Sequence, residues 1–149
     1  MKIHITKEED LVAAALKTGY TEAQLDNVAQ AIENEFEQSA KLIYNQILKE
    51  DGPGDLDVRL ILRSKDQIIA GFLPSESFPD YLVFGFFDIY IAWLIDHLDD
   101  EDNELHITVL HELMHSVDFK ELRKGDNLIN QMRDRISEYI RKSSNNFPQ

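Results

Sequence analysis

Two histidines and a glutamate form the grouping in this sequence that is best suited to chemistry. His111 and His115 are four residues apart, and Glu112 follows the first of them. On a helix, side chains four apart lie on one face one turn apart, so both imidazoles can reach a single metal ion. Glu112 lies about 100° around the helix from His111. From there its carboxylate can reach a water on the metal without being a ligand, which predicts a metal site with a general base.

The helix that carries these residues is expected to run from about Asn103 to Arg123. Its apolar residues fall on one broad face, and His111 and His115 lie outside that face. The two histidines are therefore expected at the margin of the core, where a cleft can open. The apolar face comprises Ile107, Val109, Leu110, Leu113, Met114 and Val117.

Composition restricts the ligands that such a metal could have. The chain has 149 residues, of which 43% are hydrophobic and 29% charged, and this is typical of one soluble globular domain covering residues 1–149. It contains no cysteine. Disulfides, thiol ligands and cysteine nucleophiles are therefore excluded, and a metal must be held by His, Asp or Glu.

Net charge and hydropathy restrict the partners. The net charge is −13 and the sequence pI about 4.6, which argues against nucleic acid or an anionic membrane as the main partner. Solubility explains this acidity most simply, and a basic partner is the alternative. The longest apolar stretch, residues 81–95, contains Asp88 and is too short to span a bilayer, and no signal-peptide pattern follows Met1. We therefore expect a cytoplasmic protein that binds neither nucleic acid nor membrane.

The remaining elements predict an α+β fold. Thr21 and Gln24 form a capping box that opens a long amphipathic helix reaching about Lys49. Its apolar stripe is Leu25, Val28, Ile32, Phe36, Ala40, Ile43 and Ile47. We expect strands at Lys2–Thr6, Val58–Leu62, Ile68–Phe72 and Tyr81–Phe87, helices at Glu8–Lys17 and Asp88–Leu98, and a tight turn at residues 64–66.

Residues 108–117, with the sequence TVLHELMHSV, resemble the extended signature of the zincin metallopeptidases. That signature has Val or Thr three residues before the first His, uncharged residues around the pair, and an apolar residue at its end. The order of a long backing helix, several strands and then the motif helix is also similar to the zincin upper subdomain. The resemblance implies a small zincin-like α+β domain, with a mixed sheet over the active-site helix and one zinc ion per chain.

The resemblance also implies a role for each motif residue. His111 and His115 would bind zinc, and Glu112 would be the general base and proton shuttle of peptide-bond hydrolysis. Zinc lowers the pKa of its water and polarises the scissile carbonyl, and the glutamate passes the water's proton to the leaving amine. The substrate would be a peptide or protein. We expect Tyr81–Phe87 to form the edge of the cleft, where an extended peptide can add as a further strand.

A catalytic zinc needs a third protein ligand. Glu138 is predicted to supply it, from a C-terminal helix running from about Asp126 to Lys142, because residues 136–140 resemble the ligand helix of the gluzincin branch. In that branch an acidic residue stands where this chain has Lys142. Glu121 is the alternative, because its spacing resembles that of metzincin ligands, although that branch has Gly at the position of Asp118.

Asp118 lies in line with His111 and His115 and is expected to orient an imidazole, with a plain surface role as the alternative. The other histidines, His4, His97 and His106, have no partner at ligand spacing and are expected to be structural.

Two alternatives to a metallopeptidase remain open. One is a zincin-fold protein that binds metal without turnover. The other is an acidic protein-interaction module in which the motif is incidental.

Overall fold

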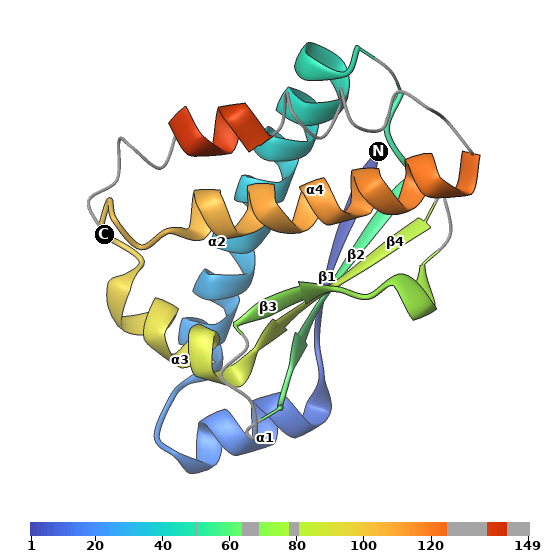
Figure 1. Ribbon diagram of the computed structural model, residues 1–149. Helices are drawn as coiled ribbons and strands as arrows, with labels where there is room; N and C mark the ends of the chain where they lie inside the picture. Colours follow the sequence, from blue (N-terminus) through green and yellow to red (C-terminus); the bar gives the residue numbers. More distant parts are fainter. Residues whose placement is uncertain (50, 64–68, 78–80, 125–136, 143–149) are drawn as a thin grey trace.

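The computed structural model describes residues 1–49, 51–63, 69–77, 81–124 and 137–142, and for residues 118–124 it describes only the course of the chain. These residues form an α+β fold in which helices pack on a four-stranded mixed sheet (Figure 1). The strand order is β1-β2-β4-β3. The expected class, α+β with a small mixed sheet, is confirmed.

Three strands of the sheet are parallel and one is antiparallel. Strand β1 (Lys2–Lys7) pairs with β2 (Asp55–Ile61), and β2 pairs with β4 (Tyr81–Phe87), both in parallel. The short strand β3 (Ala70–Phe72) pairs antiparallel with β4. In the sheet that the described residues form, β1 and β3 are therefore the two edge strands.

The helices connect these strands in the expected order. Along the chain, helices α1 (Glu9–Lys17) and α2 (Glu22–Ala40) follow β1 and precede β2. Helix α3 (Asp88–His97) follows β4 directly, and α4 (Leu105–Lys124) carries the histidine pair. A 3-10 turn, η2 (Pro74–Glu76), separates β3 from β4. Within the described ranges, no helix is long and apolar enough to cross a membrane.

The start of α2 shows how local sequence sets an element boundary. Gly19, with a φ of 102°, ends the turn after α1 in a conformation that side chains other than hydrogen disfavour. The Thr21 hydroxyl then accepts a hydrogen bond from the Gln24 amide at 3.1 Å, and the Gln24 side chain accepts one from the Thr21 amide at 2.9 Å. The predicted capping box is confirmed.

The core lies between α2 and the apolar face of the sheet. Phe36 of α2 is fully buried, and its ring lies 5.1 Å from that of Phe84 and 6.0 Å from that of Phe86, both on β4. α2 also packs against α3 and α4. Because α2 touches the sheet and both later helices, it fixes where α4 can lie. Its buried apolar residues are Leu25, Val28, Ile32, Phe36 and Ala40, as expected.

The long helix does not continue as an α-helix to Lys49. After Ala40 the chain forms a π-helix, η1 (Lys41–Ile47), and the Leu48 amide bonds to the Ile43 carbonyl, five residues earlier, at 2.8 Å. The wider turn buries Ile43, Tyr44 and Leu48, whereas Ile47 is only half-buried. The π-turn therefore rotates Tyr44 into the core, which α-helical spacing did not predict.

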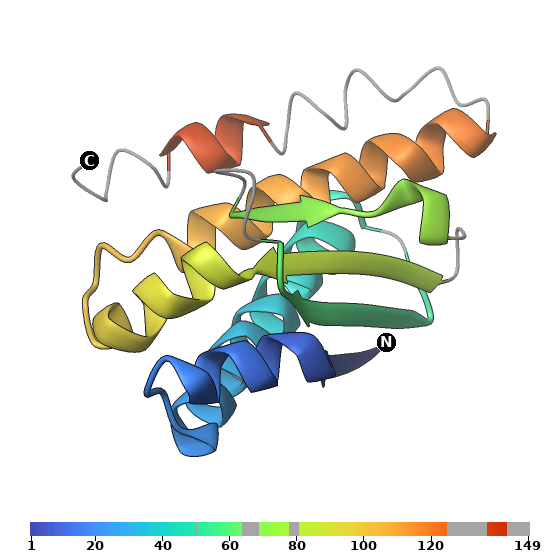
Figure 2. The same ribbon diagram turned by 90° about the horizontal axis from the view of Figure 1, so that it is seen from below.

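The expected position of Tyr81–Phe87 is wrong. This segment, β4, lies between β2 and β3, and residues 82–87 are all buried. An interior strand covered on both faces has a nearly continuous apolar sequence, and this strand has one. The edge is formed by β3, which packs against α4 and lies between α4 and the rest of the sheet (Figure 2). The turn expected at residues 64–66 lies outside the described residues.

Candidate functional site

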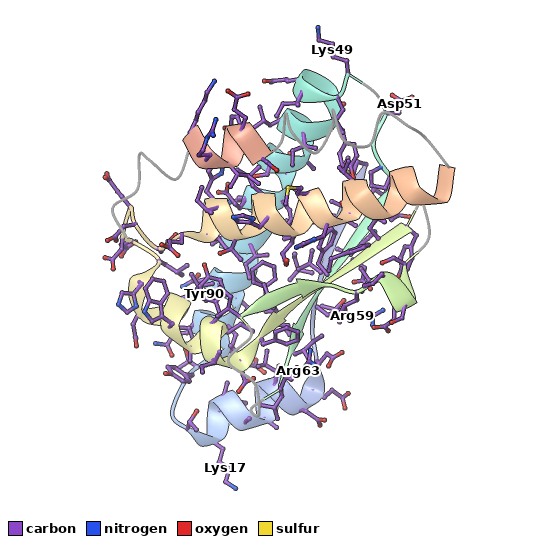
Figure 3. The ribbon with its side chains drawn as sticks, in the orientation of Figure 1. Lys17, Lys49, Asp51, Arg59, Arg63 and Tyr90 are labelled. Carbon is purple, nitrogen blue, oxygen red and sulfur yellow. The ribbon has the colours of Figure 1, made fainter. Side chains whose placement is uncertain are left out.

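A single asparagine joins the end of α3 to the start of α4. The Asn103 side chain accepts a hydrogen bond from the Leu105 amide at 3.0 Å and donates one to the His97 carbonyl at 3.3 Å. Tyr90 of α3, which is labelled in Figure 3, donates its hydroxyl to the Asn103 carbonyl at 3.1 Å. Burial raises the pKa of Tyr90 to about 12, so this phenol stays protonated and keeps donating. These contacts fix the point at which the motif helix begins.

The two faces of α4 are divided as the sequence predicts. His111 and His115 are exposed, and the apolar residues around them on the helix are turned into the core. Met114 is half-buried. The buried set is Ile107, Val109, Leu110, Leu113 and Val117. The helix is thus anchored by its apolar face, and His111 and His115 lie outside that face, as expected.

A buried hydrogen bond ties α4 to the π-turn. The Ser116 hydroxyl donates to the Leu113 carbonyl at 2.6 Å, and the Tyr44 hydroxyl lies 3.3 Å from the Ser116 oxygen. Because the Ser116 proton is engaged with Leu113, Tyr44 is the donor to Ser116. Both side chains are fully buried, so this contact helps to set the rotation of α4 about its own axis. Ser116, a polar residue within the apolar face of α4, is the feature of the sequence that could have indicated this buried hydrogen bond.

The environment of His111 favours the neutral imidazole. Partial burial of its ring lowers its pKa from the ordinary value of 6.5, and the nearby His115 lowers it further, because a second positive charge would be repelled. At neutral pH His111 therefore carries no charge and has a free ring nitrogen lone pair. That is the form in which histidine binds metals.

Glu112 is a buried acid on the motif helix. The residue is only 9% exposed, and within the described part of the chain its Oε2 atom has no hydrogen-bond partner. Burial raises the pKa of its carboxyl above 4.5, and the neighbouring His115 partly offsets that rise. Buried carboxylates are normally paired, because leaving one unpaired lowers stability. A group kept in this state at a histidine pair is typical of a functional site.

This burial predicts that Glu112→Gln stabilises the metal-free protein at neutral pH. Because the folded-state pKa is raised, ionised Glu112 destabilises the fold above its unfolded pKa, and the penalty disappears as pH falls and the carboxyl is protonated in both states. We expect the variant to gain on the order of 1 kcal/mol in free energy of unfolding at pH 7.5. At pH 4 the gain should vanish. Urea unfolding in the presence of a chelator measures both values, and an equal gain at the two pH values would refute the assignment to ionisation.

Glu138 lies on a helix that contacts α4, but its carboxylate pairs with basic side chains of its own helix. Residues 137–142 are helical, and Ser137 donates a hydrogen bond to the Met114 sulfur at 3.2 Å. The Glu138 carboxylate is exposed and pairs with Lys142 at 3.4 Å and Arg141 at 3.8 Å. The C-terminal helix therefore packs on α4, with Glu138 engaged by two neighbouring cations.

His115 lies near enough to His111 to lower its pKa, and a catalytic zinc at this pair would need a third protein ligand. No group of three or more His, Asp or Glu side chains among them is arranged to hold a metal ion, so Glu138 does not complete one with His111 and His115. The side chains of Asp118 and Glu121 lie outside the described residues, so the predictions made for them stay predictions.

The other three histidines make contacts away from the motif pair. His4 on β1 lies 3.5 Å from Asp55, and His97 stacks on Trp93 with ring centroids 4.1 Å apart. His106 contacts the carboxylate of Glu35 and so links α4 to α2. This last contact was not predicted, because it joins positions far apart in the sequence. All three contacts agree with the structural roles expected for these histidines.

Comparison of this chain with known protein families, with curated proteins and with solved structures finds no match.

Proposed function

We propose that this chain is a zinc-dependent metallopeptidase with a zincin-like fold, in which His111 and His115 bind the metal and Glu112 is the general base. One observation carries the proposal. A glutamate that is 9% exposed, and whose Oε2 atom has no hydrogen-bond partner among the described residues, lies on the same helix as two exposed imidazoles, between them in sequence. A buried carboxyl whose pKa is raised, next to two histidines on one helix, is a candidate for proton transfer.

The residues present suit zinc in their chemistry. Two imidazoles on successive turns, one of them held neutral by its surroundings, are donors that zinc prefers, and the chain has no thiol that would compete. When bound, zinc supplies a Lewis acid that acidifies a water and polarises a carbonyl. Because both histidines are exposed, a metal ion bound to them would be open to solvent and to a substrate.

The proposed work of Glu112 is to move one proton. Its carboxylate takes the proton from the attacking water and gives it to the nitrogen of the leaving amine as the peptide bond breaks. An oxygen without a competing hydrogen bond is free to accept that proton. Partial exclusion of water around Glu112 also strengthens its interaction with charges that develop nearby.

For the third ligand we propose Glu138, with Glu121 as the alternative. The helix at residues 137–142 already packs on α4 through the contact of Ser137 with Met114. We therefore propose that Glu138 leaves Lys142 by a rotation of its side chain, without movement of the helix. Its pairs with Lys142 and Arg141 join exposed groups and are therefore weak. A divalent ion at the two histidines can compete with them.

We propose that β3, rather than β4, receives the substrate. β3 is an edge strand of the described sheet and packs against α4, which carries the histidines. An extended peptide that adds to an edge strand gains main-chain hydrogen bonds without a requirement for particular side chains. This would hold a scissile bond beside the motif helix.

A fluorogenic peptide library tests the proposed function. The chain purified without chelator should cleave part of the library, lose this activity after dialysis against a chelator, and regain it when zinc is added back. A mock-dialysed sample is the control. Zinc binding without cleavage of any peptide would instead support the zincin-fold protein without turnover, and absence of both would support the interaction module.

A further inference from the structure

Three polar residues follow one another at intervals of one turn along α4. Thr108, Glu112 and Ser116 are each four residues from the next, so they lie on one face of the helix. Thr108 is half-buried, Glu112 is 9% exposed and Ser116 is fully buried. His111 and His115, which are also four residues apart, are exposed on the neighbouring face. α4 therefore turns a stripe of polar side chains inwards beside its histidines.

A tyrosine from another element contacts this polar stripe on each side of Glu112. One turn before Glu112, the Thr108 hydroxyl lies 3.5 Å from the hydroxyl oxygen of Tyr90 on α3. One turn after it, the Ser116 hydroxyl lies 3.3 Å from the hydroxyl oxygen of Tyr44 in η1. The Oε2 atom of Glu112 has no hydrogen-bond partner among the described residues. The position of this atom therefore depends on its two neighbours in the stripe.

The hydrogen bond at Ser116 opposes the tendency of Glu112 to turn towards water. A carboxylate is more stable in water than buried without a partner, so Glu112 itself favours a rotation of α4 that exposes it. The apolar contacts of α4 tolerate a small rotation, because the hydrophobic effect has no preferred direction. A hydrogen bond does have one, since it requires its donor and acceptor to be aligned. Because Ser116 turns with Glu112 on the same helix face, its bond to Tyr44 restrains both side chains.

Tyr44 is well held in its own place. It belongs to the π-helix η1, whose wider turn brings its side chain into the core, where it is fully buried. The backbone of Gly52 lies against its ring, so closely that a Cβ atom at that position would come within 3.0 Å of the Tyr44 Cγ atom. The Tyr44 hydroxyl is therefore a fixed point against which α4 is oriented.

We propose that Tyr44 is a positioning residue for Glu112. Its hydrogen bond to Ser116 fixes the rotation of α4 and so keeps the Glu112 carboxyl turned inwards, beside the exposed His111 and His115. This inference rests on the proposed metallopeptidase function for the use of Glu112 in catalysis, but not for the position of its side chain. Tyr44 itself takes no part in proton transfer, because its hydroxyl is buried against Ser116.

Chemical labelling of carboxyl groups in the full metal-free chain tests the inference without any need for turnover. A water-soluble carbodiimide couples glycine ethyl ester to the carboxyl groups that water reaches, and mass spectrometry of peptide fragments gives the labelling rate of each residue. Tyr44→Phe and Ser116→Ala should each raise the rate at Glu112 by about fivefold, because α4 is then less restrained. The double variant should raise it no further, since both changes remove the same hydrogen bond.

Two controls separate a local change at α4 from a general loosening of the fold. In the same variants, the labelling rate of Asp57, whose side chain on β2 is 15% exposed, should stay within about twofold of the wild-type rate. Tyr81→Phe removes a hydroxyl that donates to Asp57 at 3.1 Å, and it should leave the rate at Glu112 within about twofold.

Kinetics of the zinc-loaded chain give a second measurement. Tyr44→Phe should lower kcat about tenfold without a change in KM or zinc content, because only the general base is displaced. The inference is overturned if neither variant raises the labelling rate of Glu112, if the rate at Asp57 rises equally, or if Tyr81→Phe has the same effect. A wild-type chain that cleaves no peptide, while its labelling rates change as predicted, would refute only the proposed function.

Discussion

A Glu112→Gln variant is expected to hydrolyse peptides about 10²- to 10⁴-fold more slowly than the wild-type chain, with its zinc content unchanged. The amide has nearly the size of the carboxylate but cannot take a proton from water at neutral pH. Because the Glu112 Oε2 atom has no hydrogen-bond partner among the described residues, the substitution breaks no hydrogen bond at that atom, and a loss of rate with unchanged zinc content would report proton transfer. Initial rates with a fluorogenic peptide and metal analysis of the same samples measure both quantities.

The matched control for this experiment is Glu37→Gln, which removes an exposed carboxylate from α2. It should leave kcat within twofold of the wild-type value. Equal rates for wild type and Glu112→Gln would show that the general base is another residue. A loss of zinc in Glu112→Gln would show that Glu112 is a ligand, contrary to the roles assigned here.

Replacing Phe36 by Ala should lower the free energy of unfolding by about 3–5 kcal/mol. Phe36 is fully buried, and its ring packs against those of Phe84 and Phe86. Removing it leaves a cavity between α2 and β4 and also abolishes two aromatic contacts. Urea unfolding of the chelator-treated protein measures the loss without a contribution from bound metal.

Leu16→Ala is the control for this prediction, because Leu16 on α1 is 46% exposed. Its free energy of unfolding should change by less than about 0.5 kcal/mol. A loss below about 1 kcal/mol for Phe36→Ala would mean that α2 does not pack on the sheet through this ring. In that case the placement of α4, which α2 supports, would also be in doubt.

The features that sequence predicted best depend on neighbouring residues. The Thr21 capping box, the strand at Tyr81–Phe87 and the division of α4 into apolar and histidine-bearing faces all follow from spacing along a single element. Such patterns are set by helix and strand periodicity, which needs no tertiary information. The candidate pair His111 and His115 belongs to this group.

The features that sequence did not predict depend on which elements meet. The pairing of β4 with both β2 and β3 cannot be deduced from strand sequences alone, although the apolar run of β4 is typical of an interior strand. The π-turn that brings Tyr44 to Ser116 depends on α2 and α4 packing together. The burial of Glu112 likewise requires the surroundings of α4, since its helical position alone places it only at the rim of the apolar face.

The third ligand illustrates the same distinction. The motif fixes two ligands on one helix, but a third must arrive from another part of the chain or from beyond the end of the motif. A short resemblance in sequence predicts Glu138 as that ligand, and the structure places its helix near α4 with its carboxylate paired with Lys142. The sequence therefore predicts that the helix carrying Glu138 approaches α4, but not the direction in which the Glu138 side chain points.

The zinc content of the purified protein tests the central claim most directly. We predict about one zinc ion per chain, by mass spectrometry, for wild-type protein prepared without chelator, and less than a tenth of that for His111→Ala and for His115→Ala. His97→Ala, which removes a histidine that stacks on Trp93, should retain the wild-type content. A wild-type chain that holds no zinc even after incubation with it, or equal zinc in all four proteins, would contradict the proposed metal site.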